Sequence, residues 1–272
     1  MNAYKASHLV RCRSCGFVFS SQAASAADLE TYYARYPRIT ALPDITVKRY
    51  NELLSSFEKY RHTNRLIDLG CGNGLFLEQA KKRGWDVWGT EISESSLEEC
   101  RAKGIHAVKP EDASMLSRDR SFDVVTSLEV IEHLPNPKQE AKLIASLLRS
   151  GGVLYLTTPN FNSLSRLFLR SKWNVIGYPE HLCYFTPRTI VKLLNKHGLE
   201  SKNITTTGIS PYRFRRSFSD AGYGGIPGNT GDEELRRNAE EKFFYRALKN
   251  TVNTALSFSG TGDTIKATFV KR

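Results

Sequence analysis

The sequence predicts an α/β fold, in which helices cover both faces of a mostly parallel β-sheet. Short apolar runs alternate with helical patterns from about residue 66 to residue 160, and several of the helical patterns end at glycines. This alternation is typical of a parallel sheet, because each crossover helix returns the chain to the same end of the sheet. The 272 residues suffice for one such domain with additions, and the 40% of hydrophobic residues supply its core.

The elements follow from local patterns along the chain. Apolar residues at helical spacing predict helices, short apolar runs predict strands, and Thr186-Pro187 is typical of a capped helix start. The expected strands are 66–69, 86–91, 106–109, 122–127, 153–158, 203–207 and 263–270. The expected helices are 26–36, 46–60, 75–83, 94–103, 138–149, 187–197 and 232–256.

A glycine-rich turn joins the first of these strands to its helix. Gly70, Gly72 and Gly74 follow Asp68 at every second position. Glycines let the backbone turn sharply and approach a ligand, and the helix N-terminus behind them offers free N–H groups. A nicotinamide dinucleotide site would need a glycine where Leu75 stands. The next strand ends at Glu91, and a carboxylate there can accept both hydroxyls of a ribose.

This spacing after an acidic residue resembles the first motif of the class I S-adenosylmethionine (AdoMet) methyltransferases. The resemblance covers about residues 46–208 and the last strand. It implies a Rossmann-like, seven-stranded, mostly parallel sheet with an antiparallel last strand, and AdoMet as the cofactor. In that family the first acid lies near the amino-acid end of the cofactor, the second binds the ribose, and a further acid and a small residue hold the adenine. The cofactor-binding residues implied here are Asp68, Gly70, Cys71, Gly72, Gly74, Glu91, Ile92, Asp112, Ala113 and Leu128.

The resemblance also suggests how the chain is divided. Residues 1–24 form a partial zinc-ribbon-like hairpin, and residues 25–62 form a helical N-terminal cover. Residues 63–208 form the AdoMet-binding core, and residues 263–272 complete it with the last strand. Between these parts, residues 209–262 form a C-terminal insertion that acts as a lid or a dimer face.

A second motif lies after the fourth strand of the core. Glu129, Glu132 and His133 have the spacing E-x-x-E-H, and on a helical turn all three would point the same way. His181 precedes the capped helix and should face the same sheet edge. The motif resembles that of ubiquinone-biosynthesis O-methyltransferases and small-RNA 2′-O-methyltransferases, where it contributes a divalent-metal site. These four residues are therefore candidate ligands for Mg²⁺, although we expect Glu132 and His133 to buttress the turn instead.

His181 is the first candidate for the catalytic base and His133 the second, because an imidazole titrates near neutral pH. Cys12 and Cys15 resemble the second half of a zinc ribbon that precedes some methyltransferases of sugar and polysaccharide biosynthesis. Tetrahedral zinc needs four ligands, and His8 would supply only a third. We therefore expect this pair to hold no stoichiometric zinc.

The composition narrows the function further. The formal net charge is +11, but basic residues are interleaved with acidic ones, so a nucleic-acid partner is not expected. No run of 18 apolar residues suggests a membrane span, and five scattered cysteines fit a reducing compartment, so we expect a soluble cytoplasmic protein. We expect a methyltransferase acting on a small-molecule hydroxyl of the sugar, polysaccharide-precursor, quinone or phenol type, with a homodimer as one arrangement. The alternatives are an RNA-modifying methyltransferase and a nicotinamide-dependent oxidoreductase.

Overall fold

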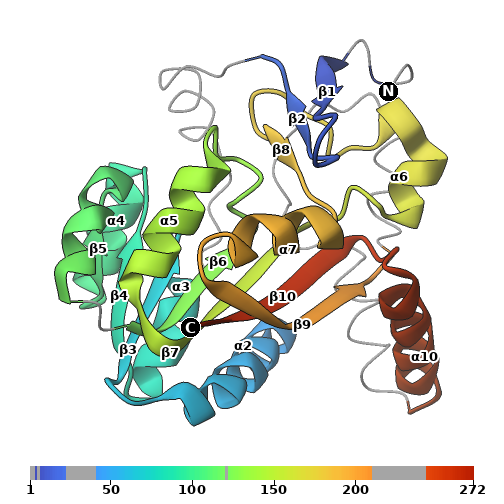
Figure 1. Cartoon of the computed structure of the whole chain (residues 1–272). Helices are drawn as coiled ribbons and strands as arrows, with labels where there is room; N and C mark the ends of the chain where they lie inside the picture. Colours follow the sequence, from blue (N-terminus) through green and yellow to red (C-terminus); the bar gives the residue numbers. More distant parts are fainter. Residues whose placement is uncertain (1–3, 5–6, 23–40, 120–121, 210–242) are drawn as a thin grey trace.

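A seven-stranded sheet forms the centre of the computed structural model, which describes residues 4, 7–22, 41–119, 122–209 and 243–272 (Figure 1). The strand order is β5-β4-β3-β6-β7-β10-β9. β10 is antiparallel to both of its neighbours, while the pairs from β5 to β7 are parallel. The predicted fold class and the antiparallel last strand are confirmed. The strands are β3 (Arg65–Leu69), β4 (Asp86–Thr90), β5 (His106–Val108), β6 (Phe122–Leu128), β7 (Leu148–Pro159), β9 (Leu199–Thr207) and β10 (Thr264–Lys271).

Each expected helix that falls within the described residues is present, with ends shifted by up to about three residues, whereas η3, α6 and η4 were not expected from the sequence. Side-chain caps fix several starts: Ser93, Asn136 and Thr186 each accept a hydrogen bond from the N–H three residues later. The expected helix 26–36 and the first part of the expected helix 232–256 lie outside the described residues. The helices are α2 (Asp44–Phe57), η2 (Glu58–Tyr60), α3 (Leu75–Lys82), α4 (Glu94–Ala102), η3 (Pro110–Asp119), α5 (Pro137–Leu147), α6 (Leu164–Leu169), η4 (Arg170–Lys172), α7 (Pro187–Asn195) and α10 (Phe243–Ser259).

Each face of the sheet has its own hydrophobic core. Successive residues of a strand point to opposite faces, so Ile67 and Leu69 pack with α5 and α7, whereas Leu66 packs with α2, α3 and α4. These strands are buried on both faces, which explains their continuous apolar sequences. The sheet is therefore a rigid platform for the loops at its edges.

A smaller sheet lies beside the carboxyl end of β7. It consists of β1 (Leu9–Arg11), β2 (Val18–Ser20) and β8 (Cys183–Tyr184), and we call it the cap sheet (Figure 1). Asn160, directly after β7, pairs with Phe185, directly after β8. A third apolar cluster fills the space under the cap sheet, with Tyr4, Leu9, Val18, Phe161, Leu169, Trp173, Val175 and Tyr184. The N-terminal hairpin thus packs against the segment that contains His181.

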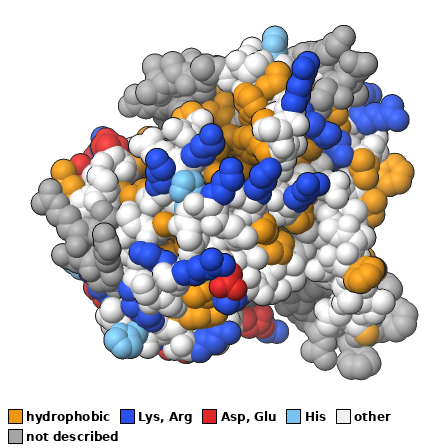
Figure 2. All heavy atoms as spheres, viewed as in Figure 1, with side chains coloured by type: hydrophobic (Ala, Val, Ile, Leu, Met, Phe, Trp, Pro, Cys, Tyr) orange, Lys and Arg blue, Asp and Glu red, His pale blue; other side chains and the backbone are white. Residues whose placement is uncertain are grey.

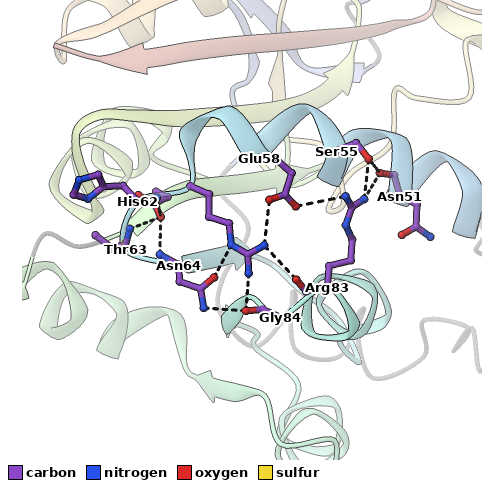
Figure 3. A network of polar contacts seen from close by, with 10 residues as sticks. Asn51, Ser55, Glu58, His62, Thr63, Asn64, Arg83 and Gly84 are labelled. Carbon is purple, nitrogen blue, oxygen red and sulfur yellow. Dashed lines mark hydrogen bonds and ion pairs between the residues drawn. The ribbon is translucent and has the colours of Figure 1, made fainter.

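A polar network closes the opposite end of the sheet. Oδ2 of Asp123, at the start of β6, accepts hydrogen bonds from three successive backbone N–H groups, those of residues 62–64, at 2.7–2.8 Å. Its other oxygen accepts a bond from Nε of Arg149 at 2.5 Å. Nearby, Arg83 donates to the carbonyl of Asn51 and the hydroxyl of Ser55, which ties α3 to α2 (Figure 3). This network therefore stabilises the end of the sheet opposite the carboxyl ends of the parallel strands.

On the face that Figure 2 shows, basic side chains are numerous but are not gathered into one patch. In Figure 2, Lys and Arg side chains are spread over the visible face, with few acidic side chains among them. No helix among the described residues has the length and apolar character that crossing a membrane requires.

Candidate active site

The glycine loop after β3 turns with left-handed backbone conformations at all three glycines. Their φ values are +73°, +54° and +77° for Gly70, Gly72 and Gly74. A Cβ on Gly70 would lie 2.6 Å from Val130 Cγ2, and one on Gly74 would lie 2.7 Å from Ile105 Cδ1, so side chains are excluded there by packing. A Cβ on Gly72 would meet nothing within 4 Å. Gly72 therefore presents bare backbone to an open space, as a ligand-binding loop requires.

Asp68 is the penultimate residue of β3, just before this loop, and is only 3% exposed. The hydroxyl of Thr126, on the neighbouring strand β6, donates a 2.6 Å hydrogen bond to its Oδ1. Burial raises the pKa of Asp68 to about 7; the charge of Glu91 adds to the rise and the Thr126 bond opposes it. This carboxyl group therefore gains or loses a proton near neutral pH, and a cationic ligand would favour its ionised form.

Glu91 fastens the glycine loop to the end of β4. Its Oε2 accepts a hydrogen bond from the N–H of Gly72 at 2.9 Å, and its Oε1 accepts bonds from the N–H groups of Ile92 and Ser93 at 2.8 and 2.9 Å. The carboxylate is thus held in a fixed orientation by three backbone groups. Ile92 next to it is 48% exposed, which leaves an apolar side chain in contact with solvent beside the loop.

The remaining predicted cofactor residues come from the two flanking loops. Asp112 is exposed and Ala113 is fully buried in η3, which follows β5, and Leu128 is the last residue of β6. All ten predicted residues therefore lie at or just beyond the carboxyl ends of four neighbouring strands, β5, β4, β3 and β6. This edge is where open α/β sheets bind their ligands.

Two histidines and a glutamate meet between β6 and the loop before β8. Glu132, His133 and His181 each offer a ligand atom within 4.8 Å of the others, and the two imidazole rings lie 4.7 Å apart, centroid to centroid. Thr158 donates a 2.9 Å hydrogen bond to Glu132 Oε2. Glu132 is 2% exposed and His181 is 8% exposed. The sequence motif and the distant histidine are thus brought together.

Backbone carbonyls fix the tautomer of both imidazoles. Nδ1 of His133 lies 2.8 Å from the carbonyl oxygen of Glu180, and Nδ1 of His181 lies 2.5 Å from that of Val175. Carbonyl oxygens only accept hydrogen bonds, so each Nδ1 carries a proton and donates. Burial lowers the pKa of His133 to about 4, so this ring is neutral at pH 7. The backbone therefore holds both rings in fixed orientations.

The expected position of Glu129 is wrong. Its φ is +57°, so the chain does not begin a helical turn there, and its N–H donates to the carbonyl of Thr157 at the end of the neighbouring strand. The expectation that Glu129, Glu132 and His133 point the same way assumed helical geometry. Glu129 lies outside the cluster of ligand atoms, which is formed by Glu132, His133 and His181 in the described part of the chain.

Cys12 and Cys15 lie in the turn of the N-terminal hairpin. The N–H of Cys12 donates to the carbonyl of Phe17, and the Cys12 thiol lies 3.2 Å from Ser14 Oγ. Hydrogen bonds from Ser14 and Cys15 lower the pKa of Cys12 to about 6. The one cluster of three metal-ligating side chains among the described residues does not include this pair. Zinc at the hairpin stays untested.

Two residues of the site could not be identified from the sequence. Thr126 and Thr158 read as ordinary strand residues, yet their hydroxyls orient Asp68 and Glu132. Only their position near the carboxyl end of a strand could have indicated this role. The backbone carbonyls that orient the imidazoles cannot be recognised from the sequence, because every residue has one.

The strand order, the glycine loop and the acid after β4 define a class I AdoMet-dependent methyltransferase. The profile of a family described as "Methyltransferase domain" matches residues 43–203, which is more than half of the sequence. The chain belongs to this family.

Curated relatives and solved structures agree with this membership. The chain is 29% identical over 162 residues to the ubiquinone biosynthesis O-methyltransferase of Idiomarina loihiensis and 30% identical over 157 residues to that of Bordetella avium. Each match covers 55% of this chain, and 67% and 62% of the relative's length. A SAM-dependent methyltransferase from Archaeoglobus fulgidus has a similar fold, with a TM-score of 0.56 and 21% identity over 91% of this chain and 100% of the other.

Proposed function

We propose that this chain transfers the methyl group of AdoMet to a hydroxyl oxygen of a small-molecule acceptor. The observation that carries this proposal is the pair of imidazoles that lie 4.7 Å apart beside the cofactor edge of the sheet, each oriented by a backbone carbonyl at its Nδ1. A hydroxyl must lose its proton as it attacks, so an oxygen acceptor needs such a base. The names of the curated relatives support an acceptor of the quinone or phenol type, with sugars and polysaccharide precursors as the other class.

AdoMet supplies an activated methyl group, which carries the driving force for an in-line displacement. We assign the binding of its amino-acid end to Asp68, because a buried carboxyl at this strand end suits a cationic amino group. The open backbone face of Gly72 and the fixed carboxylate of Glu91 fit the ribose side. Ile92, Asp112, Ala113 and Leu128 fit the adenine end of the cofactor cleft. The chain's main contribution is to align the acceptor oxygen with the methyl group.

His181 is the proposed base, because its ring lies 4.7 Å from that of His133 and its segment is anchored by the cap sheet rather than by the cofactor loops. Val175, whose carbonyl contacts the His181 ring, belongs to the apolar cluster under that sheet. Leu182, which follows His181, accepts a hydrogen bond at its carbonyl from the N–H of Ser20 in β2. His133 is the second candidate. The proton would move from the acceptor oxygen to Nε2 of the imidazole.

The ligand chemistry does not favour Mg²⁺ at this site. One carboxylate and two imidazoles suit zinc, manganese or iron better than Mg²⁺, which prefers oxygen ligands. No step in the proposed reaction requires a metal. We propose that Glu132 instead orients the turn through Thr158, and that turnover does not depend on added Mg²⁺.

The binding partner we propose is a small molecule, the methyl acceptor. A small molecule fits better than RNA, because the basic side chains are dispersed rather than gathered along one groove. We further propose that the reaction takes place in the cytoplasm. A homodimer remains a prediction.

The test combines labelled AdoMet with a panel of phenols, catechols and sugars. His181→Ala should lower turnover by about a hundredfold or more, while affinity for S-adenosylhomocysteine stays within about twofold of wild type. His106→Ala is the matched control, because that ring is 61% exposed on the edge strand β5. Full turnover by His181→Ala, or a product methylated at nitrogen or carbon, would contradict the assignment of an oxygen acceptor with an imidazole base.

A further inference from the structure

Two cysteines lie in contact beneath the glycine loop. Cys71 belongs to the loop and Cys100 to α4, and their Sγ atoms are 4.0 Å apart. Cys71 is 8% exposed and Cys100 is fully buried. Two glycines leave room for the thiols: a Cβ on Gly89 would lie 2.5 Å from Cys71 Sγ, and one on Gly74 would lie 3.0 Å from Cys100 Sγ. The two thiols are therefore buried and closely packed against each other and against the neighbouring glycines.

Both thiols contact the same backbone group of the cofactor loop. The carbonyl oxygen of Gly72 accepts from Cys100 Sγ at 3.3 Å and from Cys71 Sγ at 3.6 Å. The N–H of Gly72 donates to Glu91 on the other side. The thiols and the carboxylate thus hold this one residue from opposite directions. Gly72 is also the loop glycine whose Cα faces open space.

We infer that Cys71 and Cys100 form an oxidation site, at which a two-electron oxidant of the peroxide class converts the two thiols to a disulfide and weakens cofactor binding. The second half of this inference rests on the proposed cofactor site. In the balanced reaction the Cys100 thiolate attacks one oxygen of hydrogen peroxide, the O–O bond breaks, the attacked oxygen stays on sulfur as a sulfenic acid, and the other oxygen leaves as hydroxide and takes up the thiol proton to become water. The Cys71 thiol then attacks that sulfur and the sulfenic hydroxyl leaves as water, so two thiols and one peroxide give one disulfide and two waters.

The local charges favour Cys100 as the first nucleophile. When Cys100 is ionised, the Cys71 S–H donates to the Cys100 sulfur instead of the Gly72 carbonyl, and this hydrogen bond lowers the pKa of Cys100. The ammonium group of Lys103 acts in the same direction, whereas burial and the carboxylates of Glu91 and Glu99 oppose it. Lys103 is held nearby, since its Nζ donates to the carbonyl of Asn73 at 2.7 Å. The thiolate is the reactive form of cysteine.

Closing the disulfide must bring the two sulfurs together. A disulfide holds its sulfurs about 2 Å apart, so the present separation of 4.0 Å has to shrink by about 2 Å. α4 is anchored in the core by Leu97 and capped by Ser93, so we expect the Cys71 side of the pair, which lies in the loop, to take up most of this movement. Oxidation also removes the S–H groups that can donate to the Gly72 carbonyl. We therefore expect the backbone that faces the cofactor to shift and to lose hydrogen bonding at Gly72.

The experiment uses the full chain with Cys12→Ser and Cys15→Ser, so that the exposed hairpin thiols do not react. The protein is treated with hydrogen peroxide, and peptide mapping by mass spectrometry locates any disulfide. Titration calorimetry with S-adenosylhomocysteine follows, before and after dithiothreitol. We expect a Cys71–Cys100 disulfide and an affinity at least about tenfold weaker, which dithiothreitol restores.

Cys100→Ser is the control, because its hydroxyl can still donate to Gly72 but cannot form a disulfide. Its affinity should be unaffected by peroxide, and thermal unfolding verifies that it folds. If the reduced protein does not bind S-adenosylhomocysteine at all, the proposed function is contradicted. Peptide mapping still tests in that case whether the Cys71–Cys100 disulfide forms. Absence of the Cys71–Cys100 linkage, or a mapped linkage with unchanged affinity, would overturn the inference.

Discussion

The proton on Asp68 provides a direct test of the cofactor site. Burial raises the pKa of this carboxyl group to about 7, so the folded protein without ligand carries a proton there below neutral pH. If Asp68 binds the amino group of the cofactor, it does so as a carboxylate. Ligand binding must then expel the proton, and affinity should rise with pH until Asp68 is ionised in the free protein.

The size of the effect follows from this pKa. A group that titrates near pH 7 is ionised to about one-eleventh at pH 6 and about ten-elevenths at pH 8, so affinity should be about tenfold weaker at pH 6 than at pH 8. At pH 7 binding should release about half a proton per ligand. His133 does not contribute in this window, because its pKa is lowered to about 4.

The assay is titration calorimetry with S-adenosylhomocysteine from pH 6 to pH 8, in buffers of different ionisation enthalpy. Thr126→Val removes the hydrogen bond that lowers the pKa of Asp68, so its affinity profile should shift to higher pH. Asp68→Asn should bind more weakly and lose the part of the pH dependence that Asp68 causes. Glu140→Gln is the matched control, since burial also raises the pKa of Glu140 to about 7, but on α5.

A flat wild-type profile with no proton release would refute the reasoning. So would a profile that Asp68→Asn leaves unchanged, because the titrating group would then belong to the ligand or to another residue.

Three further predictions concern other parts of the molecule. Asp123→Ala should lower the free energy of unfolding by about 3–5 kcal/mol in urea titrations, because Arg149 and three backbone N–H groups lose a buried acceptor; a loss under about 1 kcal/mol would contradict this. Glu91→Ala should weaken S-adenosylhomocysteine binding at least about tenfold, since it releases the glycine loop and removes the proposed ribose ligand; unchanged affinity would exclude that role. Elemental analysis should find no stoichiometric zinc; one zinc per chain that Cys12→Ser or Cys15→Ser removes would reverse that expectation.

The main sheet could be predicted because each of its parts has a local signal. The apolar run around Ile67, the glycines after it and the capped start at Thr186 each specify an element without reference to distant residues. The mostly parallel arrangement and the antiparallel last strand then followed from the resemblance and from the preference for right-handed crossovers. The cofactor edge was predictable for the same reason, since parallel strands end together.

What could not be predicted depends on contacts between distant segments. β8 has only two residues, and it is a strand because β2 pairs with it. The turn at Glu129 takes a left-handed conformation that its sequence does not require. The orientation of His181 depends on the carbonyl of Val175, and no side-chain pattern reports a backbone oxygen. Propensity rules describe neighbours in sequence, and these features depend on neighbours in space.

The cap sheet also has a consequence for the order in which the molecule forms during synthesis. β1 and β2 leave the ribosome first, but their partner β8 follows only after every parallel strand from β3 to β7. A two-stranded ribbon with such short strands is barely stable in water, so it must wait with Leu9 and Val18 exposed. Pairing across so long a stretch of chain is slow. The core under the parallel strands also waits for later residues, among them Ile190, Leu199 and Phe269, so both halves of the site are completed only when the last strands have been made.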